Sequence, residues 1–207
     1  IFEHIYFARP DSVIDGQSVN ESRVLTGQLL AQQHPVDADL VIGVPDSGLS
    51  SAIGYSMESG IPFGLGLVKN RYIGRTFIQP SQSQRERSVA LKLNVLKSNV
   101  NGKRIIMVDD SIVRGTTIAN IVKLLKKAGA LEVHVRIASP KFLFPCFFGT
   151  DVPDSDQLAC CKYTDEQLLE KISADSLGFL DVNTLEQIAP NSKVHFCKGC
   201  FTGVYPS

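Results

Sequence analysis

The stretch Val108-Asp109-Asp110-Ser111-Ile112-Val113-Arg114-Gly115-Thr116-Thr117 decides the fold of this 207-residue chain. Residues 103–108, which lead into it, form a short apolar run after a glycine, and such a run predicts a buried strand. Residues 118–128, which follow it, carry apolar side chains at helical spacing up to Gly129, a residue typical of helix C-terminal ends. The sequence therefore predicts a strand, a polar loop and a helix in direct succession.

The same succession occurs elsewhere in the middle of the chain. Residues 39–44 read as a strand buried on both faces, residues 50–59 as the following helix, and residues 132–138 as a further strand. Repeated strand, loop and helix units predict a mainly parallel sheet with helices on both faces, which is the α/β class. We expect one domain over residues 1–207, with a core at about 39–138.

Accessory segments, residues 1–38 and 139–207, flank this core. The elements expected there are a strand at 2–8, a helix after the Ser18–Glu21 capping box that ends near His34, a helix at 164–172, a strand at 177–180 and a helix at 182–188. A further strand is expected at 63–68 and an irregular tail at 196–203. The low periodicity of residues 69–87 predicts a polar, basic loop.

Composition narrows the class of protein. Lys and Arg together number 21, as do Asp and Glu, so the formal net charge is zero. A generic nucleic-acid binder carries excess basic charge, and no apolar run approaches the ~18 residues of a membrane span. The five cysteines all lie after residue 145, which favours a reducing, cytoplasmic compartment. The absence of an initiator Met leads us to expect a piece of a longer protein.

The loop after residue 108 has the chemistry of a phosphate site. Its hydroxyls and backbone N–H groups stand at a helix N-terminus, which suits a phosphate monoester. Asp109 and Asp110 can bond the vicinal hydroxyls of an attached sugar, directly or through Mg²⁺. The loop lacks the Gly-Lys-Ser/Thr end of a P-loop and the three-glycine dinucleotide fingerprint. An Asp pair alone is also compatible with an ordinary capped turn.

The full loop matches the phosphoribosyl pyrophosphate motif of type I phosphoribosyltransferases. Together with residues 6–12, 44–47 and 69–80, which occur in the same order, it closely resembles the synthase half of the glutamine phosphoribosylpyrophosphate amidotransferase family. The resemblance extends over essentially all 207 residues. It implies the type I phosphoribosyltransferase fold.

The resemblance also implies a reaction. In that family, ammonia displaces pyrophosphate from phosphoribosyl pyrophosphate to give 5-phosphoribosylamine, the first step of de novo purine biosynthesis. The ammonia comes from glutamine through an N-terminal glutaminase domain, to which nothing in this chain corresponds. A homo-oligomer and feedback inhibition by purine nucleotides are implied as well, without nucleic-acid or membrane partners.

Residue roles follow from the same resemblance. The implied catalytic residues are Asp109, Asp110, Lys69 and Arg71, and the positions tied to Mg²⁺ are Ser47, Asp109 and Asp110. The implied substrate-binding residues are Asp46, Ser47, Gly48, Arg75, Ser111, Arg114, Gly115, Thr116 and Thr117. Ser47 is a weak metal ligand by itself, so we expect it to act through pyrophosphate or water. The basic stretch with Arg71 and Arg75 resembles the loop that folds over substrate and excludes water.

The cysteine pattern leaves alternatives open. Cys197-Lys198-Gly199-Cys200 by itself fits a redox pair, a zinc site or half of an iron–sulfur site, and His195 with Cys146 would complete a zinc set. The resemblance implies a 4Fe–4S cluster held by Cys146, Cys197 and Cys200, with the fourth ligand just before Ile1. Its implied role is structural or oxygen-sensing, and Cys160 and Cys161 match no ligand position.

Two other functions compete with the amidotransferase. A regulator that keeps the fold to sense a nucleotide or bind DNA is disfavoured by the zero net charge and the absence of a helix-turn-helix extension. A salvage phosphoribosyltransferase would need a hood that recognises a base, which the first block and the cysteine tail do not resemble.

Overall fold

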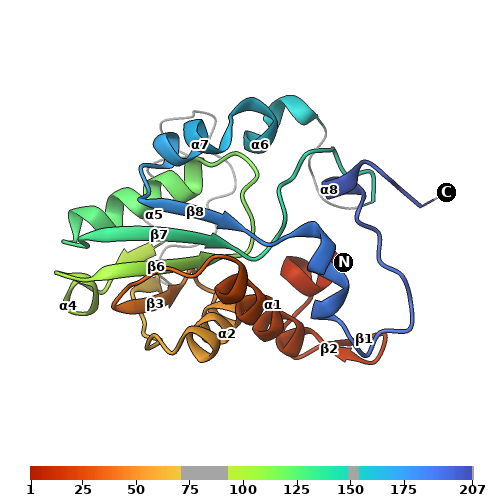
Figure 1. Cartoon of the computed structure of the whole chain (residues 1–207), viewed down its shortest axis with the longest axis horizontal. Helices are drawn as coiled ribbons and strands as arrows, with labels where there is room; N and C mark the ends of the chain where they lie inside the picture. The colour runs from red at the N-terminus through yellow and green to blue at the C-terminus, as the bar shows by residue number, and fades with distance from the viewer. Residues whose placement is uncertain (71–92, 149–153, 207) are drawn as a thin grey trace.

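A parallel sheet of four strands forms the centre of the computed structural model, which describes residues 1–70, 93–148 and 154–206. The strand order is β3-β6-β7-β8 (Figure 1). The bounds are Leu40–Gly43 for β3, Arg104–Asp109 for β6, Glu132–Ile137 for β7 and Ser176–Phe179 for β8. Every pairing between neighbouring strands is parallel, so their carboxyl ends meet at one edge.

Both faces of the sheet are buried because β6 alternates between two cores. Ile105 and Met107 face one hydrophobic cluster, and Ile106 and Val108 face the other. A strand with apolar side chains on both faces must be covered on both, which explains its continuous apolar sequence.

Helices provide that cover (Figure 1). On one face, α5 (Thr116–Lys127) packs its apolar stripe against the β6 side chains Ile105 and Met107. On the other face lie α1 (Val19–Gln33) and α2 (Leu49–Ser59), whose buried residues join the cluster of Ile106. The predicted α/β class, with a parallel sheet and helices on both faces, is confirmed.

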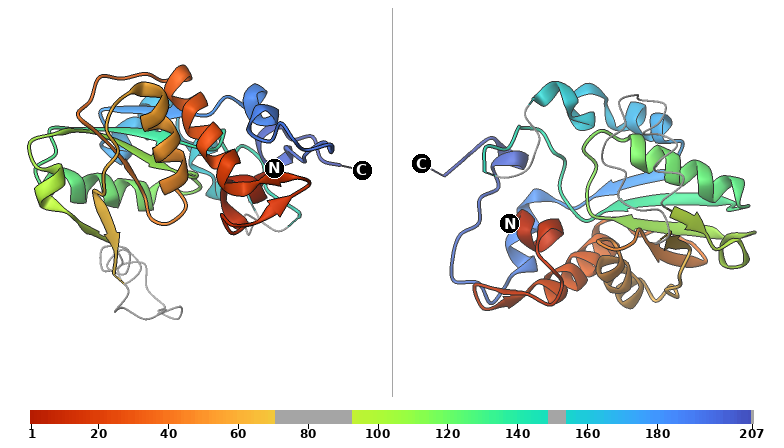
Figure 2. Two further views of the ribbon diagram at one scale, coloured as in Figure 1. Left: turned by 90° about the horizontal axis from the view of Figure 1, so that it is seen from below. Right: turned by 180° about the vertical axis from the view of Figure 1, so that it is seen from behind.

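The remaining elements decorate this core. In chain order they are η1 (Glu3–Phe7), β1 (Val13–Ile14), β2 (Gln17–Ser18), β4 (Leu67–Lys69), β5 (Leu93–Val95), α4 (Lys97–Val100), η2 (Ser155–Gln157), α6 (Ala159–Lys162), α7 (Asp165–Ile172), η3 (Val182–Ile188) and α8 (Gly199–Thr202). The two ends of the chain lie at the same end of the molecule (Figure 2). Within the described ranges, no helix has both the length and the apolar character needed to cross a membrane.

Several local predictions are wrong in ways that have a physical reason. The expected strand at 2–8 is a π-helix, η1, because tertiary contacts bury His4 and Ile5 and override the β propensity of the segment. The tail expected to be irregular contains the short helix α8. The helix expected at 182–188 is present with the same bounds, as the 3-10 helix η3. Only the end of the expected strand at 63–68 is a strand, as β4.

Other local signals are confirmed. Ser18 caps α1 by accepting a hydrogen bond from the Glu21 N–H, and Thr164 forms a full capping box at α7 with Gln167. Gly60 ends α2 in the left-handed conformation, where a glycine is favoured. These signals are local, so the sequence shows them directly.

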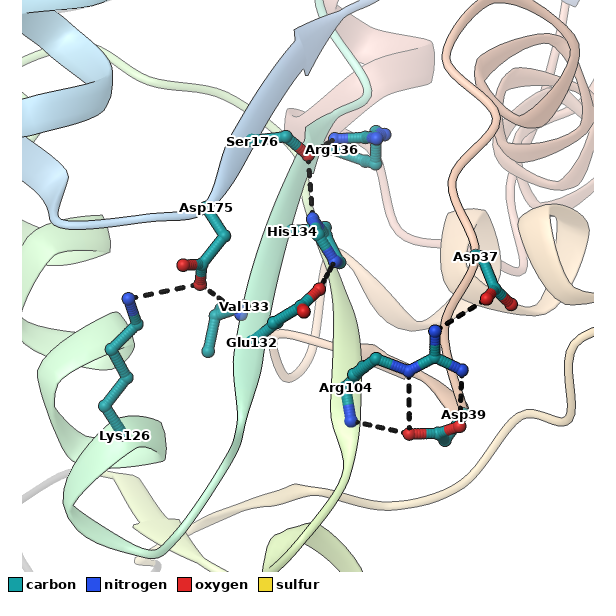
Figure 3. A network of polar contacts seen from close by, with 10 residues as sticks. All are labelled: Asp37, Asp39, Arg104, Lys126, Glu132, Val133, His134, Arg136, Asp175 and Ser176. Atoms are coloured by element: carbon teal, nitrogen blue, oxygen red, sulfur yellow. Dashed lines mark hydrogen bonds and ion pairs between the residues drawn. The ribbon is translucent and has the colours of Figure 1, made fainter.

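A polar network runs along β6, β7 and β8 (Figure 3). Arg104, at the start of β6, pairs with Asp37 and Asp39, and its hydrogen bonds hold the pKa of Asp39 at about 2. Further along, Ser176 bridges the side chains of His134 and Arg136. These contacts fasten the sheet at the end opposite to the carboxyl edge and along its α1 face.

The α1 and α2 helices cross at two glycines. A Cβ on Gly54 would lie 1.9 Å from the Val24 carbonyl oxygen, and one on Gly27 would lie 1.9 Å from that of Ser51. Neither backbone can yield without separating the helices, so these two positions require glycine.

Gly54→Ala is therefore expected to lower the free energy of unfolding by about 2 kcal/mol, as overpacking does. In an exposed helix the same change raises the free energy of unfolding by up to ~1 kcal/mol. A decrease in Gly54→Ala would therefore indicate close packing of the two helices at this glycine. Met57→Ala, at a 65% exposed position of α2, is the control and should change stability little. Urea unfolding measures both, and a Gly54→Ala protein as stable as the parent would contradict the close helix crossing.

Candidate functional site

A cavity of about 750 Å³ opens at the carboxyl edge of the sheet, where β3 and β6 end. Its walls come from the segment after β3, from the end of β4, from the loop between β6 and α5, and from the N-terminal helix η1. Its lining includes aromatic, basic, acidic and hydroxyl side chains, those of Phe2, Tyr6, Phe7, Ser47, Lys69, Asp109, Asp110, Ser111, Arg114, Thr116 and Thr117, together with Gly115. This is the edge at which open α/β sheets bind ligands.

Two adjacent carboxylates form the floor of the cavity. Asp109 is the last residue of β6, and Asp110 follows it; they are 7% and 8% exposed. Burial, and next the neighbouring charge of Asp110, raise the pKa of Asp109 well above its ordinary value. Both side chains are therefore almost fully buried, although both residues border the cavity.

Hydrogen bonds compensate Asp110 in part. Its carboxylate accepts from the Ser47 hydroxyl and from the Ser111 hydroxyl, and its backbone N–H donates to Asp109 Oδ1 at 2.9 Å. Burial raises the pKa of Asp110, and the two hydroxyl bonds and the charge of Arg23 oppose this rise without overcoming it. The backbone bond lowers the pKa of Asp109 instead, and burial outweighs it there too. The site thus carries more negative charge than its own donors balance.

The segment that carries Ser47 is held close to β6 by a glycine. A Cβ on Gly48 would lie 2.4 Å from the Val108 carbonyl oxygen, so only glycine permits this approach. The peptide bond between Pro45 and Asp46 is cis. The mostly exposed Asp46 side chain pairs with Lys69, with 2.7 Å between Asp46 Oδ2 and Lys69 Nζ.

The loop between β6 and α5 ends at a helix N-terminus. Gly115 adopts φ +78°, which a glycine reaches without strain, and Thr116 and Thr117 begin α5. Unpaired N–H groups of the first turn and the two threonine hydroxyls border the cavity, an arrangement that suits an anion. Arg114 of this loop donates to the Gln157 side chain.

The structure thus brings together most of the residues expected from the sequence. Ser47, Lys69, the two aspartates and the residues of the loop before α5 border one cavity, while Asp46 and Gly48 lie in the segment beside it. Arg71 and Arg75 lie outside the described residues. The aromatic side of the cavity, made of Phe2, Tyr6 and Phe7, was not predicted, because residues 2–8 have the sequence of a strand. An i, i+4 aromatic pair, Phe2 and Tyr6, was the available signal for a helix.

The cysteines form a second feature, at the end of the molecule where the chain termini lie. Burial, and next the charges of Cys146 and Cys197, raise the pKa of Cys200 to about 12, so Cys146 and Cys197 both act electrostatically on Cys200. The N-terminal amine of Ile1 lies 3.3 Å from the Cys197 carbonyl oxygen. No cysteine of the chain forms a disulfide. Cys160 lies elsewhere, on α6, where burial raises its pKa to about 11.

No group of three or more His, Cys, Asp or Glu side chains in residues 1–70, 93–148 and 154–206 is arranged to hold a metal ion. The zinc set that His195 would complete with the cysteines is therefore not supported, and Cys146, Cys197 and Cys200 do not form a metal site by themselves within these residues either.

Comparison with known proteins identifies the class. Residues 16–139 match the family described as "Phosphoribosyl transferase domain". The chain belongs to this phosphoribosyltransferase family, and the matched residues contain both loops that border the cavity.

The relatives within that family are amidophosphoribosyltransferases, as the sequence resemblance led us to expect. The Synechocystis amidophosphoribosyltransferase is 52% identical over 206 residues, which are 100% of this chain and 42% of that protein. The Bacillus subtilis amidophosphoribosyltransferase is 51% identical over 209 residues, covering 99% of this chain and 44% of that protein. The chain thus spans less than half the length of these relatives.

A solved structure gives the same result in three dimensions. The glutamine phosphoribosylpyrophosphate amidotransferase from B. subtilis, complexed with ADP and GMP, superimposes with a TM-score of 0.89 at 51% identity. The match covers 99% of this chain and 46% of that one. The expected type I phosphoribosyltransferase fold is therefore confirmed.

The uncompensated charge of the site leads to a pair of stability predictions with opposite signs. Asp109→Asn keeps an oxygen to accept the Asp110 N–H but removes a buried charge, so the melting temperature without ligand should stay equal or rise. Ser47→Ala removes a donor to a buried carboxylate and should cost about 1.5–3 kcal/mol. Differential scanning calorimetry at pH 7 measures both, and a large destabilisation by Asp109→Asn would show that the carboxylates are adequately paired.

Proposed function

We propose that this chain is the synthase part of an amidophosphoribosyltransferase, which forms 5-phosphoribosylamine from phosphoribosyl pyrophosphate and ammonia. The observation that carries the proposal is the buried Asp109–Asp110 pair at the end of β6, directly before the N-terminus of α5 and opposite Ser47. One cavity thereby offers donors for a phosphate, carboxylates for a sugar and a second loop for pyrophosphate.

The 5-phosphate would bind at the loop before α5. The Thr116 and Thr117 hydroxyls and the first-turn N–H groups would donate to its oxygens, and the positive end of the α5 dipole favours its charge. The Ser111 hydroxyl, which donates to Asp110 in this structure, would exchange that bond for one to the phosphate. Gly115 supplies the positive φ of +78° at which the loop turns into α5. Arg114 supplies a nearby positive charge.

The ribose hydroxyls would then face the two aspartates. The residues present fit Mg²⁺ there, because two buried carboxylates with raised pKa values lack positive charge and Mg²⁺ prefers oxygen ligands. Asp109 and Asp110 would hold the ion with the substrate oxygens, and Ser47 would act through pyrophosphate or water. When bound, Mg²⁺ neutralises charge on the pyrophosphate.

Pyrophosphate would lie between the Asp46–Gly48 segment and Lys69. In the described structure Lys69 pairs with Asp46, and both side chains are exposed. A surface pair of this kind is weak, so Lys69 can exchange Asp46 for the pyrophosphate at little cost. We propose that Arg71 and Arg75 add charge at the same place.

The reaction requires that the negative charge on the leaving pyrophosphate is stabilised and that ammonia is positioned next to C1. The C1–O bond to pyrophosphate breaks, the ammonia lone pair forms the C1–N bond, and one proton leaves the nitrogen. Negative charge grows on the leaving group, so donors and cations aimed at it lower the barrier, while ammonia needs no strong base to attack.

Asp109→Asn and Asp110→Asn are expected to reduce phosphoribosylamine formation about 100-fold or more, the usual cost of losing a preorganised charge. Ammonia and phosphoribosyl pyrophosphate are supplied to the complete gene product, and phosphoribosylamine is trapped and counted. Asp165→Asn, which changes an exposed carboxylate that pairs with Lys141, is the control. Near-normal kcat in both site variants would refute the assignment.

Lys69→Ala is expected to raise KM for phosphoribosyl pyrophosphate or lower kcat, because a charge beside the leaving group is lost. Release of ammonia from glutamine, measured separately in the complete gene product, should change much less. Equal loss of both activities would point to a folding defect and count against this role.

We also propose a 4Fe–4S cluster at Cys146, Cys197 and Cys200. Three points support it: Cys146 and Cys197 both act electrostatically on the buried Cys200, the Phe148 N–H donates to Cys146 Sγ at 3.4 Å, and the Ile1 amine lies beside the Cys197 carbonyl. A residue before Ile1 would stand next to these thiols as the fourth ligand. The cluster would pin the tail to the domain and take no part in the displacement.

Cys197→Ser therefore tests the cluster. The complete gene product, purified without oxygen, should be brown with about four irons per chain, and the variant should lose both the colour and the protease resistance of its tail. Cys161→Ser, at an exposed cysteine on α6, should change neither. The proposal would be refuted if the parent protein is colourless and free of iron and if the tail of Cys197→Ser is as resistant to protease as that of the parent.

The remaining partners are proposals of the same kind. The relative complexed with ADP and GMP supports purine nucleotides as feedback inhibitors of this chain's protein. We propose further that a glutaminase domain of the same protein supplies ammonia, that the protein is a cytoplasmic homo-oligomer, and that residues 1–38 and 139–207 are accessory to a core at 39–138.

A further inference from the structure

A buried arginine stands behind the aromatic side of the cavity. Arg23, on α1, is 5% exposed. Its Nε donates to the His4 carbonyl oxygen at 3.0 Å, and its Nη2 donates to those of Tyr6 at 3.0 Å and Ala8 at 2.7 Å. None of the ion pairs found in the described ranges includes Arg23, so its hydrogen-bond partners there are backbone carbonyls.

Two of these carbonyls, those of His4 and Tyr6, belong to η1, and the third belongs to Ala8, the residue that follows it. A helix of five residues is not stable alone, because nucleation is unfavourable and its last carbonyls have no partner within the helix. The Arg23 guanidinium donates hydrogen bonds to these three carbonyls, so it supplies the missing donors. It also places a positive charge at the negative end of the η1 helix dipole. Arg23 therefore fixes η1 onto α1.

The η1 helix in turn carries the aromatic wall, defined as Phe2, Tyr6 and Phe7. The rings pack on one another, with centroids 5.3 Å apart for Phe2 and Phe7 and 5.2 Å apart for Tyr6 and Phe7. Tyr6 and Phe7 are about half exposed, and all three line the cavity that holds Asp110. The rings contact one another, so the Arg23 bonds that hold the η1 backbone also help to fix the wall at this cavity.

We propose that Arg23 is a positioning residue that holds the aromatic wall over the reacting carbon, so that ammonia and not water captures it. This inference rests on the proposed function. Capture by water would break the same C1–O bond to pyrophosphate, form a C1–O bond from water and release one proton, giving ribose 5-phosphate. An apolar wall in place keeps water away from that carbon.

The partition between the two products tests this role. The complete gene product receives phosphoribosyl pyrophosphate, Mg²⁺ and an ammonium salt; total pyrophosphate and trapped phosphoribosylamine are measured, and their difference is hydrolysis. In Arg23→Gln the hydrolysed fraction should rise about tenfold, since small misplacements near the reacting atoms have large effects. The fraction does not depend on how much protein is folded, so a merely structural role would leave it unchanged.

Arg136→Gln is the matched control. Arg136, on β7, is 3% exposed and donates to the carbonyl oxygens of His34 and Val135. It also donates to the Ser176 hydroxyl (Figure 3), and it is not among the residues that line the cavity. Its loss should destabilise the protein as much as the loss of Arg23, yet leave the hydrolysed fraction as in the parent. An equal rise in both variants would overturn the proposal.

Hydrogen exchange tests the clamp without the reaction. The Ala8 N–H, which donates to the Glu3 carbonyl oxygen at 3.1 Å, should exchange faster in Arg23→Gln than in the parent or Arg136→Gln. If Arg23→Gln does not fold, Arg23→Lys replaces it, because lysine keeps the positive charge but lacks the planar guanidinium. The hydrolysed fraction and the exchange rate of the Ala8 N–H should then rise by less than in Arg23→Gln. Unchanged exchange or an unchanged hydrolysed fraction overturns the proposal. Failure of the proposed function shows separately, as a parent protein that releases no pyrophosphate.

Discussion

The burial of two neighbouring carboxylates at the end of β6 is the constraint on which the site depends. Asp109 and Asp110 are both more than nine-tenths buried, and burial raises both of their pKa values. Like charges placed side by side in a protein interior need positive charge or hydrogen-bond donors. The Ser47 and Ser111 hydroxyls provide part of this, and the charge of Arg23 adds to it. The rest is what a cation and a sugar would supply.

The need of these buried carboxylates for hydrogen-bond donors and positive charge explains how the neighbouring elements are arranged. Gly48 lets the segment after β3 approach β6 closely enough for Ser47 to reach Asp110. Gly115 turns the chain so that α5 begins at the cavity, and η1 closes the other side with aromatic rings. Each of these features lies in a loop or a chain end, while the alternating side chains of β6 keep the sheet itself fixed between two cores. Binding chemistry is thus carried by segments that a rigid sheet positions.

The parts that the sequence predicted share a physical origin. The strands at the core and the α5 helix carry strong, local hydrophobic periodicity, and caps such as Ser18 and Thr164 act within one turn. The loop before α5 was recognisable because its residues are contiguous. The burial of Asp109 and Asp110 was not predictable, because it comes from segments far apart in the chain. The same holds for η1. Its aromatic, β-branched sequence favours a strand, but hydrogen bonds from Arg23 on α1 to the backbone carbonyls of His4, Tyr6 and Ala8 stabilise the helix instead.

The central claim is that the carboxylate pair and the helix N-terminus together bind a phosphoribosyl pyrophosphate that arrives with a divalent cation. Isothermal titration of the complete gene product with phosphoribosyl pyrophosphate, with and without Mg²⁺, measures this directly. We predict one molecule bound per chain with Mg²⁺ and at least about tenfold weaker binding without it, since the unneutralised pyrophosphate would then face two buried carboxylates. Binding that is equally tight in the absence of any divalent cation would contradict the claim.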